Sequence, residues 1–200
     1  MTTLVVRLAP ERSRAGARAA FAVACAIGGA AMISVLAQVR IPLPFTPVPI
    51  TGQTLGVLLV GAAYGPVLGV STIALYLAWG AVGIPVFAGG AEGVAVLGPA
   101  SATGGYLWGF VAASALVGLL ARAGWDRSFG SAVGAMFLGT VTIYAVGVSW
   151  LMAAIDVPLD RAIELGLAPF VIGDTLKVLG AASALPFAWR LLGRNDRGGG

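Results

Sequence analysis

Long hydrophobic runs separated by short polar or proline-rich segments dominate the chain from residue 17 to residue 191. A membrane-spanning helix needs about 20 mostly apolar residues. Residues 53–83 carry no charge, and Gly65-Pro66 is their one plausible break, because proline is well tolerated in the first turn of a new helix. The pattern predicts an all-α integral membrane protein, a single bundle of six transmembrane helices at residues 17–39, 53–64, 66–83, 104–122, 130–153 and 169–191.

Composition excludes several classes of protein. The 200 residues are 58% hydrophobic and 10% charged, whereas soluble domains carry roughly 25% charged residues. Histidine is absent and Cys25 is the only cysteine, so we expect neither a metal site nor a disulfide framework, and no cofactor. The 30 glycines fit helices that approach each other closely in a membrane.

Arginines are distributed unevenly between the two predicted sides of the membrane. Arg40 and Arg161 fall on one side, and nine fall on the other: Arg7, Arg12, Arg14, Arg18, Arg122, Arg127, Arg190, Arg194 and Arg197. The positive-inside rule therefore places both termini in the cytoplasm. We expect a cytoplasmic N-terminal segment (1–16), a transmembrane domain (17–191) and a disordered cytoplasmic tail (192–200) in the cell membrane. Arginines at the ends of apolar runs are typical of membrane proteins, so we expect no nucleic-acid partner.

Two long outer connections are irregular and largely apolar. Residues 40–52 contain four prolines and residues 84–103 are rich in glycine and proline, so neither can form one regular helix. Irregular backbone near a membrane must be buried in protein or line a cavity. We interpret both segments as lids over a site; the alternative is that they are structural connectors.

Asp174 and Lys177, which is the only lysine, lie three residues apart in the last apolar run. At helical spacing they share one face. Ionisable side chains at membrane depth usually face a bundle interior or a water-filled cavity. The pair therefore indicates a site for a polar ligand, or else an ion pair that only holds helices together.

Other chemistry is largely excluded. A P-loop needs its lysine after glycine, whereas Lys177 stands between leucine and valine, so the chain cannot itself be a P-loop ATPase. A Ser–His hydrolase lacks its histidine. A serine–lysine dyad using Lys177 stays conceivable, although no nucleophile motif supports such an intramembrane enzyme.

Small and aromatic residues form two weaker patterns. Pairs such as Ala20 and Ala24 in the first span permit close helix approach, either within the bundle or to a partner subunit. Aromatic side chains gather near the predicted outer ends, where they form an interfacial belt or line a pocket for an apolar ring; they are Phe45, Tyr76, Trp79, Phe87, Tyr106 and Trp108.

Four motifs in order, PVPITGQTLG (47–56), GIPVFAGG (83–90), TGGYLWGF (103–110) and PFVIGDTLK (169–177), resemble the BioY family. The resemblance covers the chain from the first span to Trp189. It implies a six-helix substrate-binding (S) component that captures biotin from outside. It also implies a transmembrane coupling subunit and cytoplasmic ATPases as partners, in a transporter of the energy-coupling-factor (ECF) type. Another vitamin or small heterocycle on the same scaffold is the alternative substrate.

The resemblance also implies roles for particular residues. It places ligand contacts on Asp174 and Lys177, and the partner surface on Ala15, Ala19, Ala20 and Ala24. For biotin, an ionised Asp174 can accept from the ureido N–H groups and Lys177 can donate to the carbonyl. The other expected substrate-binding residues are Tyr106, Trp79 and Phe87 as an apolar wall, Thr51 and Gln53 as hydrogen-bonding groups, Gly90 through its backbone, and Arg40.

Arg40 can supply a cation for the ligand's carboxylate tail; the alternative is an interfacial arginine that extends toward water. The sequence departs from the family pattern between Gly98 and Tyr106, where the tight GPTGGYL is lengthened by three residues.

Overall fold

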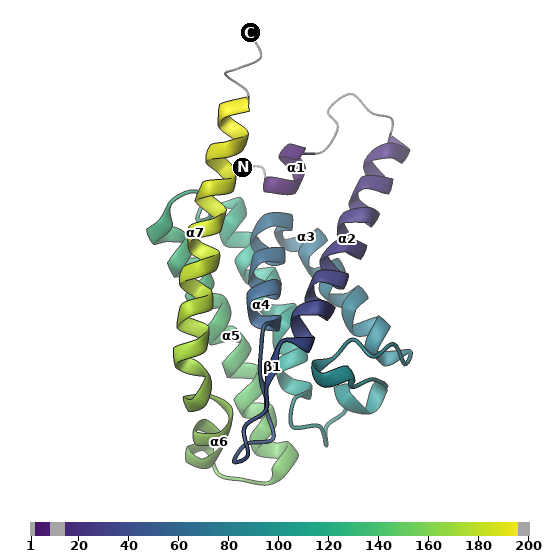
Figure 1. The fold of residues 1–200 in the computed structure, drawn as a ribbon, viewed down its shortest axis with the longest axis vertical. Coiled ribbons are helices and arrows are strands. Elements are labelled where there is room, and N and C mark those ends of the chain that lie inside the picture. Colours follow the sequence, from purple (N-terminus) through teal and green to yellow (C-terminus); the bar gives the residue numbers. More distant parts are fainter. Residues whose placement is uncertain (1–2, 9–14, 196–200) are drawn as a thin grey trace.

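The computed structural model describes residues 3–8 and 15–195, and Figure 1 shows an all-helical bundle. Its helices are α1 (Leu4–Leu8), α2 (Ala15–Gln38), α3 (Gln53–Ala81), α4 (Gly104–Arg122), α5 (Phe129–Ile155), α6 (Leu159–Gly166) and α7 (Val171–Asn195). Two-residue strands β1 (Arg40–Ile41) and β2 (Ile50–Thr51) pair antiparallel. Short 3-10 turns cover Ala88–Gly90 (η1), Val94–Leu97 (η2) and Ala168–Phe170 (η3).

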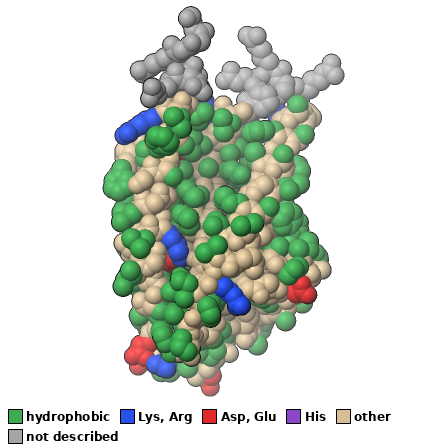
Figure 2. Space-filling view, viewed as in Figure 1, with side chains coloured by type: hydrophobic (Ala, Val, Ile, Leu, Met, Phe, Trp, Pro, Cys, Tyr) green, Lys and Arg blue, Asp and Glu red, His purple; other side chains and the backbone are tan. Residues whose placement is uncertain are grey.

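Five segments of the described chain are long and apolar enough to cross a membrane. They are α2, α3, α4, α5 and the stretch Leu159–Leu192, which includes most of α7. The face of the molecule seen in Figure 2 carries abundant hydrophobic side chains and few charged ones. The molecule is a multi-pass membrane protein.

α3 is a hairpin of two helical arms. Gly65 breaks the helix with φ 79° and ψ −179°, a conformation that glycine adopts at little cost. A Cβ on Gly69 would lie 3.3 Å from the Cα of Gly61, and the Gln53 amide bonds the Tyr76 hydroxyl at 2.6 Å. In a straight helix, 23 residues would span roughly 34 Å, so the arms run back along each other (Figure 1). The predicted break at Gly65-Pro66 is confirmed.

Small residues bring the neighbouring helices close to this hairpin. A Cβ on Gly118 of α4 would lie only 2.4 Å from the Pro66 nitrogen, so α4 packs directly against the turn. α2 crosses the hairpin at Gly29, where a Cβ would lie 3.0 Å from the Tyr64 ring and 2.8 Å from the Thr72 methyl. The glycine content thus serves close helix packing, as expected for a membrane bundle.

α6 was not predicted from the sequence. It is eight residues long and carries Asp160, Arg161 and Glu164, so it has no apolar run of spanning length. Its C-terminal carbonyls find donors elsewhere: Thr46 Oγ1 donates to the Leu165 carbonyl at 2.6 Å, and the Tyr106 hydroxyl donates to that of Gly166 at 2.8 Å. These bonds satisfy groups that a helix end leaves without intrahelical partners.

The described ends of α1 and α7 lie at the same end of the molecule (Figure 1). α7 continues to Asn195, four residues beyond the predicted limit of 191. Of the predicted terminal segments, residues 1–2, 9–14 and 196–200 lie outside the described residues.

The connection between α4 and α5 is tied to α7 at this end. Asp126 is 1% exposed, and its Oδ2 accepts from Trp189 Nε1 at 2.6 Å, while Arg127 stacks 4.8 Å from the Trp189 ring centre. Burial raises the pKa of the Asp126 carboxyl, although the hydrogen bonds from Trp189 and the backbone, together with the charge of Arg127, act to lower it.

Candidate functional site

A cavity of about 250 Å³ lies at the end of the bundle opposite the Gly65 turn. Both irregular connections line it, with Pro47, Val48 and Pro49 from the first and Phe87, Ala88 and Ala91 from the second. Residues of α3, α4, α5 and α7 form most of the remaining wall. The prediction that these connections border a cavity is confirmed, whereas their movement as lids stays a prediction.

Asp174 and Lys177 lie on one face of α7 and form an ion pair, in which Asp174 is buried and Lys177 is half-buried. Lys177 Nζ is 2.6 Å from Asp174 Oδ1, and their side chains are 17% and 8% exposed, respectively. Nζ also donates to the Thr51 carbonyl at 2.6 Å and to Thr54 Oγ1 at 3.1 Å. Because an ammonium has three donors, every N–H of Lys177 already has a protein partner.

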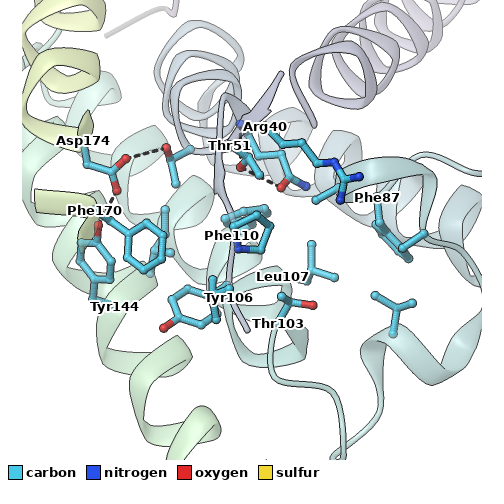
Figure 3. A pocket seen from close by; sticks show the side chains of 18 of the residues that line it. Arg40, Thr51, Phe87, Thr103, Tyr106, Leu107, Phe110, Tyr144, Phe170 and Asp174 are labelled. Carbon is cyan, nitrogen blue, oxygen red and sulfur yellow. Dashed lines mark hydrogen bonds between the residues drawn. The ribbon is translucent and has the colours of Figure 1, made fainter. Parts of the chain in front are cut away.

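The Asp174 carboxylate is held equally firmly. Besides Lys177, Thr54 Oγ1 donates to Oδ1 at 3.2 Å and the Tyr144 hydroxyl donates to Oδ2 at 2.5 Å (Figure 3). All three neighbours donate, which suits an acceptor-only carboxylate. The side chain is therefore fixed in position from three helices: α3, α5 and α7.

Thr51 and Gln53 are joined in a chain of hydrogen bonds that leads away from this pair. Thr51 Oγ1 donates to Gln53 Oε1 at 2.9 Å, and Gln53 Nε2 donates to the Tyr76 hydroxyl. Tyr76 in turn donates to the Val86 carbonyl at 3.2 Å. The chain links residues 40–52 to residues 84–103 through the base of the α3 hairpin.

Arg40 lines the cavity beside the second connection. A Cβ on Gly89 would lie 2.3 Å from Arg40 Nη1 and 2.4 Å from Cζ, so the guanidinium occupies the space that a larger residue would fill. Gly89 has φ 71° and ψ 26°, in the left-handed region. In Figure 3, Arg40 lies on the opposite side of the cavity from Asp174, with aromatic rings between them.

The aromatic wall differs in part from the prediction. Tyr106 and Phe87 line the cavity as expected, and Phe87 packs edge-on against Tyr76 with ring centres 5.5 Å apart. Trp79 and Gly90 are not among its lining residues. Trp79 packs instead against the hydrophobic core, because it points from a different face of its helix than Tyr76.

The sequence was also compared with known proteins. A model of the BioY family matches residues 10–194. The chain belongs to the BioY family.

Among its BioY relatives, a Pyrococcus horikoshii protein named "Probable biotin transporter BioY" is 40% identical over 82% of this chain and 91% of the relative. "Biotin transporter BioY" of Thermotoga maritima is 40% identical over 76% of this chain and 86% of the relative. A solved structure titled "Crystal structure at 2.1 A of the S-component for biotin from an ECF-type ABC transporter" covers 89% of this chain and 95% of its own. It aligns with a TM-score of 0.78 at 26% identity.

Several residues that line this BioY-family cavity were not predicted from the sequence, among them Thr54, Phe110, Tyr144 and Phe170. Thr54 directly follows Gln53 in the motif PVPITGQTLG (47–56), so its place in that motif could have indicated it as a site residue. Tyr144 stands in an apolar run with no charge nearby in sequence, and only the packing of α5 against α7 brings it to Asp174.

The other predictions concern partners and metals. Ala15, Ala19, Ala20 and Ala24 are all exposed on α2 within the described structure. Among the residues that the structure describes, no three His, Cys, Asp or Glu side chains come together as a metal site.

Proposed function

We propose that this chain is the membrane-embedded S component of an ECF-type importer, and that biotin is its ligand. The observation that carries the proposal is the Asp174–Lys177 ion pair, which lines an aromatic-walled cavity in a member of the BioY family. The chain acts by binding and not by catalysis, because the family it belongs to consists of transporter subunits.

The polar head of biotin is a neutral ureido group with two N–H donors and one carbonyl. Its N–H groups find an acceptor in Asp174, and its carbonyl finds a donor in Lys177. Since all three N–H groups of Lys177 already have partners, the carbonyl must replace one of them. We expect it to replace Thr54, which accepts at the longest distance, 3.1 Å.

The rest of the ligand matches the remaining wall. Tyr106, Phe87 and Phe110 offer apolar surface for the fused rings. Arg40 supplies a cation for the carboxylate tail, and Gly89 leaves the room that its guanidinium needs. On this reading Arg40 serves the ligand and is not simply an interfacial arginine.

Six membrane crossings follow if each arm of α3 counts as one, with both termini in the cytoplasm and the cavity facing outward. The arms, 53–64 and 66–81, are shorter than a perpendicular span of about 20 residues. The arginine asymmetry supports this orientation, and the family supports the cytoplasmic membrane as the location.

Capture would then be completed by the two irregular connections, which close over the ligand. Energised uptake depends on a transmembrane coupling subunit and cytoplasmic ATPases, because the chain has no phosphate-binding loop of its own. The exposed alanines of α2 are the surface that we assign to the coupling subunit.

Equilibrium binding of labelled biotin to the purified chain tests the proposal. Charge-assisted hydrogen bonds contribute about 1.5–3 kcal/mol, so Asp174→Asn and Lys177→Ala should each weaken binding by roughly 10- to 150-fold. Asp160→Asn and Arg161→Ala are matched controls at exposed positions of α6 and should bind as the parent does.

Thermal unfolding of each variant shows whether it is folded. The charge-neutral double variant Asp174→Asn/Lys177→Met addresses the alternative in which the pair only joins helices. Parent-like affinity in this variant would remove the pair from the site. A folded parent that does not bind biotin would refute the substrate, and competition with other vitamins would then identify the ligand.

A further inference from the structure

A second, larger cavity of about 550 Å³ lies at the other end of the bundle, where α1, α2, the α3 turn and the end of α4 meet. Its wall is mainly apolar, with Val5, Phe21, Val67 and Leu68 among its residues. It lies at the end of the molecule that carries the described ends of α1 and α7 (Figure 1). The binding site uses none of its residues.

Two cations border this cavity. Arg18 of α2 and Arg122 of α4 both line it, and both are exposed. Within the described residues, neither makes a hydrogen bond or ion pair, and no carboxylate is among the residues that line the cavity. The cavity therefore joins an apolar interior to a positively charged rim.

The cavity is accessible from the side of the helix bundle. Residues 15–25 of α2 are exposed or half-buried, and Ala26 is the first fully buried residue of this helix. Figure 1 shows this part of α2 leaning away from the other helices. The close contacts of α2 with the hairpin begin at Gly29 and continue at Ile33 and Leu36, which pack against Gly56. A molecule with an apolar chain can thus enter between α2 and α3 from the membrane.

We infer that this cavity binds an anionic phospholipid from the leaflet at that end. The planar guanidinium groups of Arg18 and Arg122 match the geometry of a phosphate diester. An acyl chain would lie against Phe21 and Leu68. Basic pockets between transmembrane helices are suited to anionic head groups. A free phosphate would leave the apolar wall without a partner, so the combination of chemistries favours a lipid.

Native mass spectrometry of the purified full chain, incubated with dioleoylphosphatidylglycerol or dioleoylphosphatidylcholine, tests the inference. Each arginine near anionic lipid favours binding by about fivefold, so together they should give a preference of roughly 25-fold for phosphatidylglycerol. R18Q/R122Q should lose this preference, whereas R18K/R122K should keep most of it. R127Q/R190Q removes two arginines from the same end and should retain the parent's preference.

A cavity-filling variant separates a defined site from a charged surface. Ala22 lines the cavity and is half-buried, so Ala22→Trp should reduce retention of both lipids while both arginines stay in place. Equal retention of the two lipids by the parent overturns the inference. The inference is also overturned if R18Q/R122Q and R127Q/R190Q lose the preference for phosphatidylglycerol equally, or if Ala22→Trp retains both lipids fully. In either case the arginines would act only as diffuse surface charge. Biotin binding at the opposite end checks folding.

Discussion

Gly89→Ala is the substitution that most directly tests the role of Arg40. The new methyl group would lie 2.3 to 2.8 Å from three guanidinium atoms of Arg40, closer than real carbon contacts allow. The guanidinium is the flexible end of its side chain, whereas Gly89 is held in the backbone of η1. Arg40 must therefore move out of its position beside the cavity.

Gly89→Ala has two separate costs, one in the stability of the fold and one in the affinity for the ligand. A left-handed backbone conformation costs a non-glycine residue about 1–2 kcal/mol. A charge-assisted hydrogen bond to the ligand carboxylate contributes about 1.5–3 kcal/mol, which corresponds to roughly 10- to 150-fold in affinity. Gly90→Ala isolates the first cost, because Gly90 has φ 75° but its Cβ would meet only Pro85, at 4.0 Å.

Isothermal titration calorimetry with biotin and with biotinamide, whose tail is neutral, measures the loss of affinity, and thermal unfolding measures the loss of stability. For biotin, Gly89→Ala should bind at least tenfold more weakly than Gly90→Ala. For biotinamide, the two variants should differ by less, since a neutral hydrogen bond contributes only about 0.5–1.5 kcal/mol. An equal penalty for both ligands, or equal affinities of the two variants for biotin, would refute the assignment of Arg40 to the carboxylate.

Three further predictions concern stability, each measured by thermal unfolding in detergent. Tyr144→Phe removes a donor to the Asp174 carboxylate and should destabilise the fold by about 1.5–3 kcal/mol; an unchanged unfolding temperature would contradict the described network. Gly118→Ala places a methyl group 2.4 Å from backbone that cannot yield and should cost about 3 kcal/mol. Gly180→Ala meets no atom within 4 Å and should stabilise its helix by about 0.5–1 kcal/mol. Similar unfolding temperatures for Gly118→Ala and Gly180→Ala would contradict the close packing described at Gly118. Because burial raises the pKa of Asp126, the folded state holds its proton to higher pH than the unfolded chain, and this group's contribution to stability falls as pH rises from about 3.8 through the folded-state pKa. Asp126→Asn should remove this fall, and an unchanged pH profile would argue against it.

The sequence predicted a structural feature correctly wherever a local pattern of residue types determines that feature. Apolar runs of spanning length gave the long helices, and the fixed spacing of Asp174 and Lys177 put them on one face of α7. Gly65-Pro66 marked the α3 turn, because few other sequences end one helix and begin the next so abruptly.

The contacts between elements were not predictable in the same way. Tyr144 reaches Asp174 only because α5 packs against α7, and no local pattern encodes that distance. Trp79 was placed in the wall because it is aromatic and near the outer end, yet the rotation of its helix directs it elsewhere. α6 was missed because eight mixed residues fall below the length that hydrophobicity can identify.

The complete hydrogen bonding of Lys177 has a consequence for selectivity. A ligand that reaches this ammonium does not form an additional hydrogen bond, because every N–H already has an acceptor. It replaces one existing hydrogen bond with a new one. An incoming carbonyl that replaces Thr54 leaves the number of hydrogen bonds to Lys177 unchanged. A molecule of the same shape without that carbonyl would displace the threonine and leave one N–H of this half-buried ammonium without an acceptor, at a cost of about 1–3 kcal/mol. The site therefore discriminates against analogues of the ligand by the balance of hydrogen-bond donors and acceptors. A cavity of modest size can be selective in this way without a rigid steric fit.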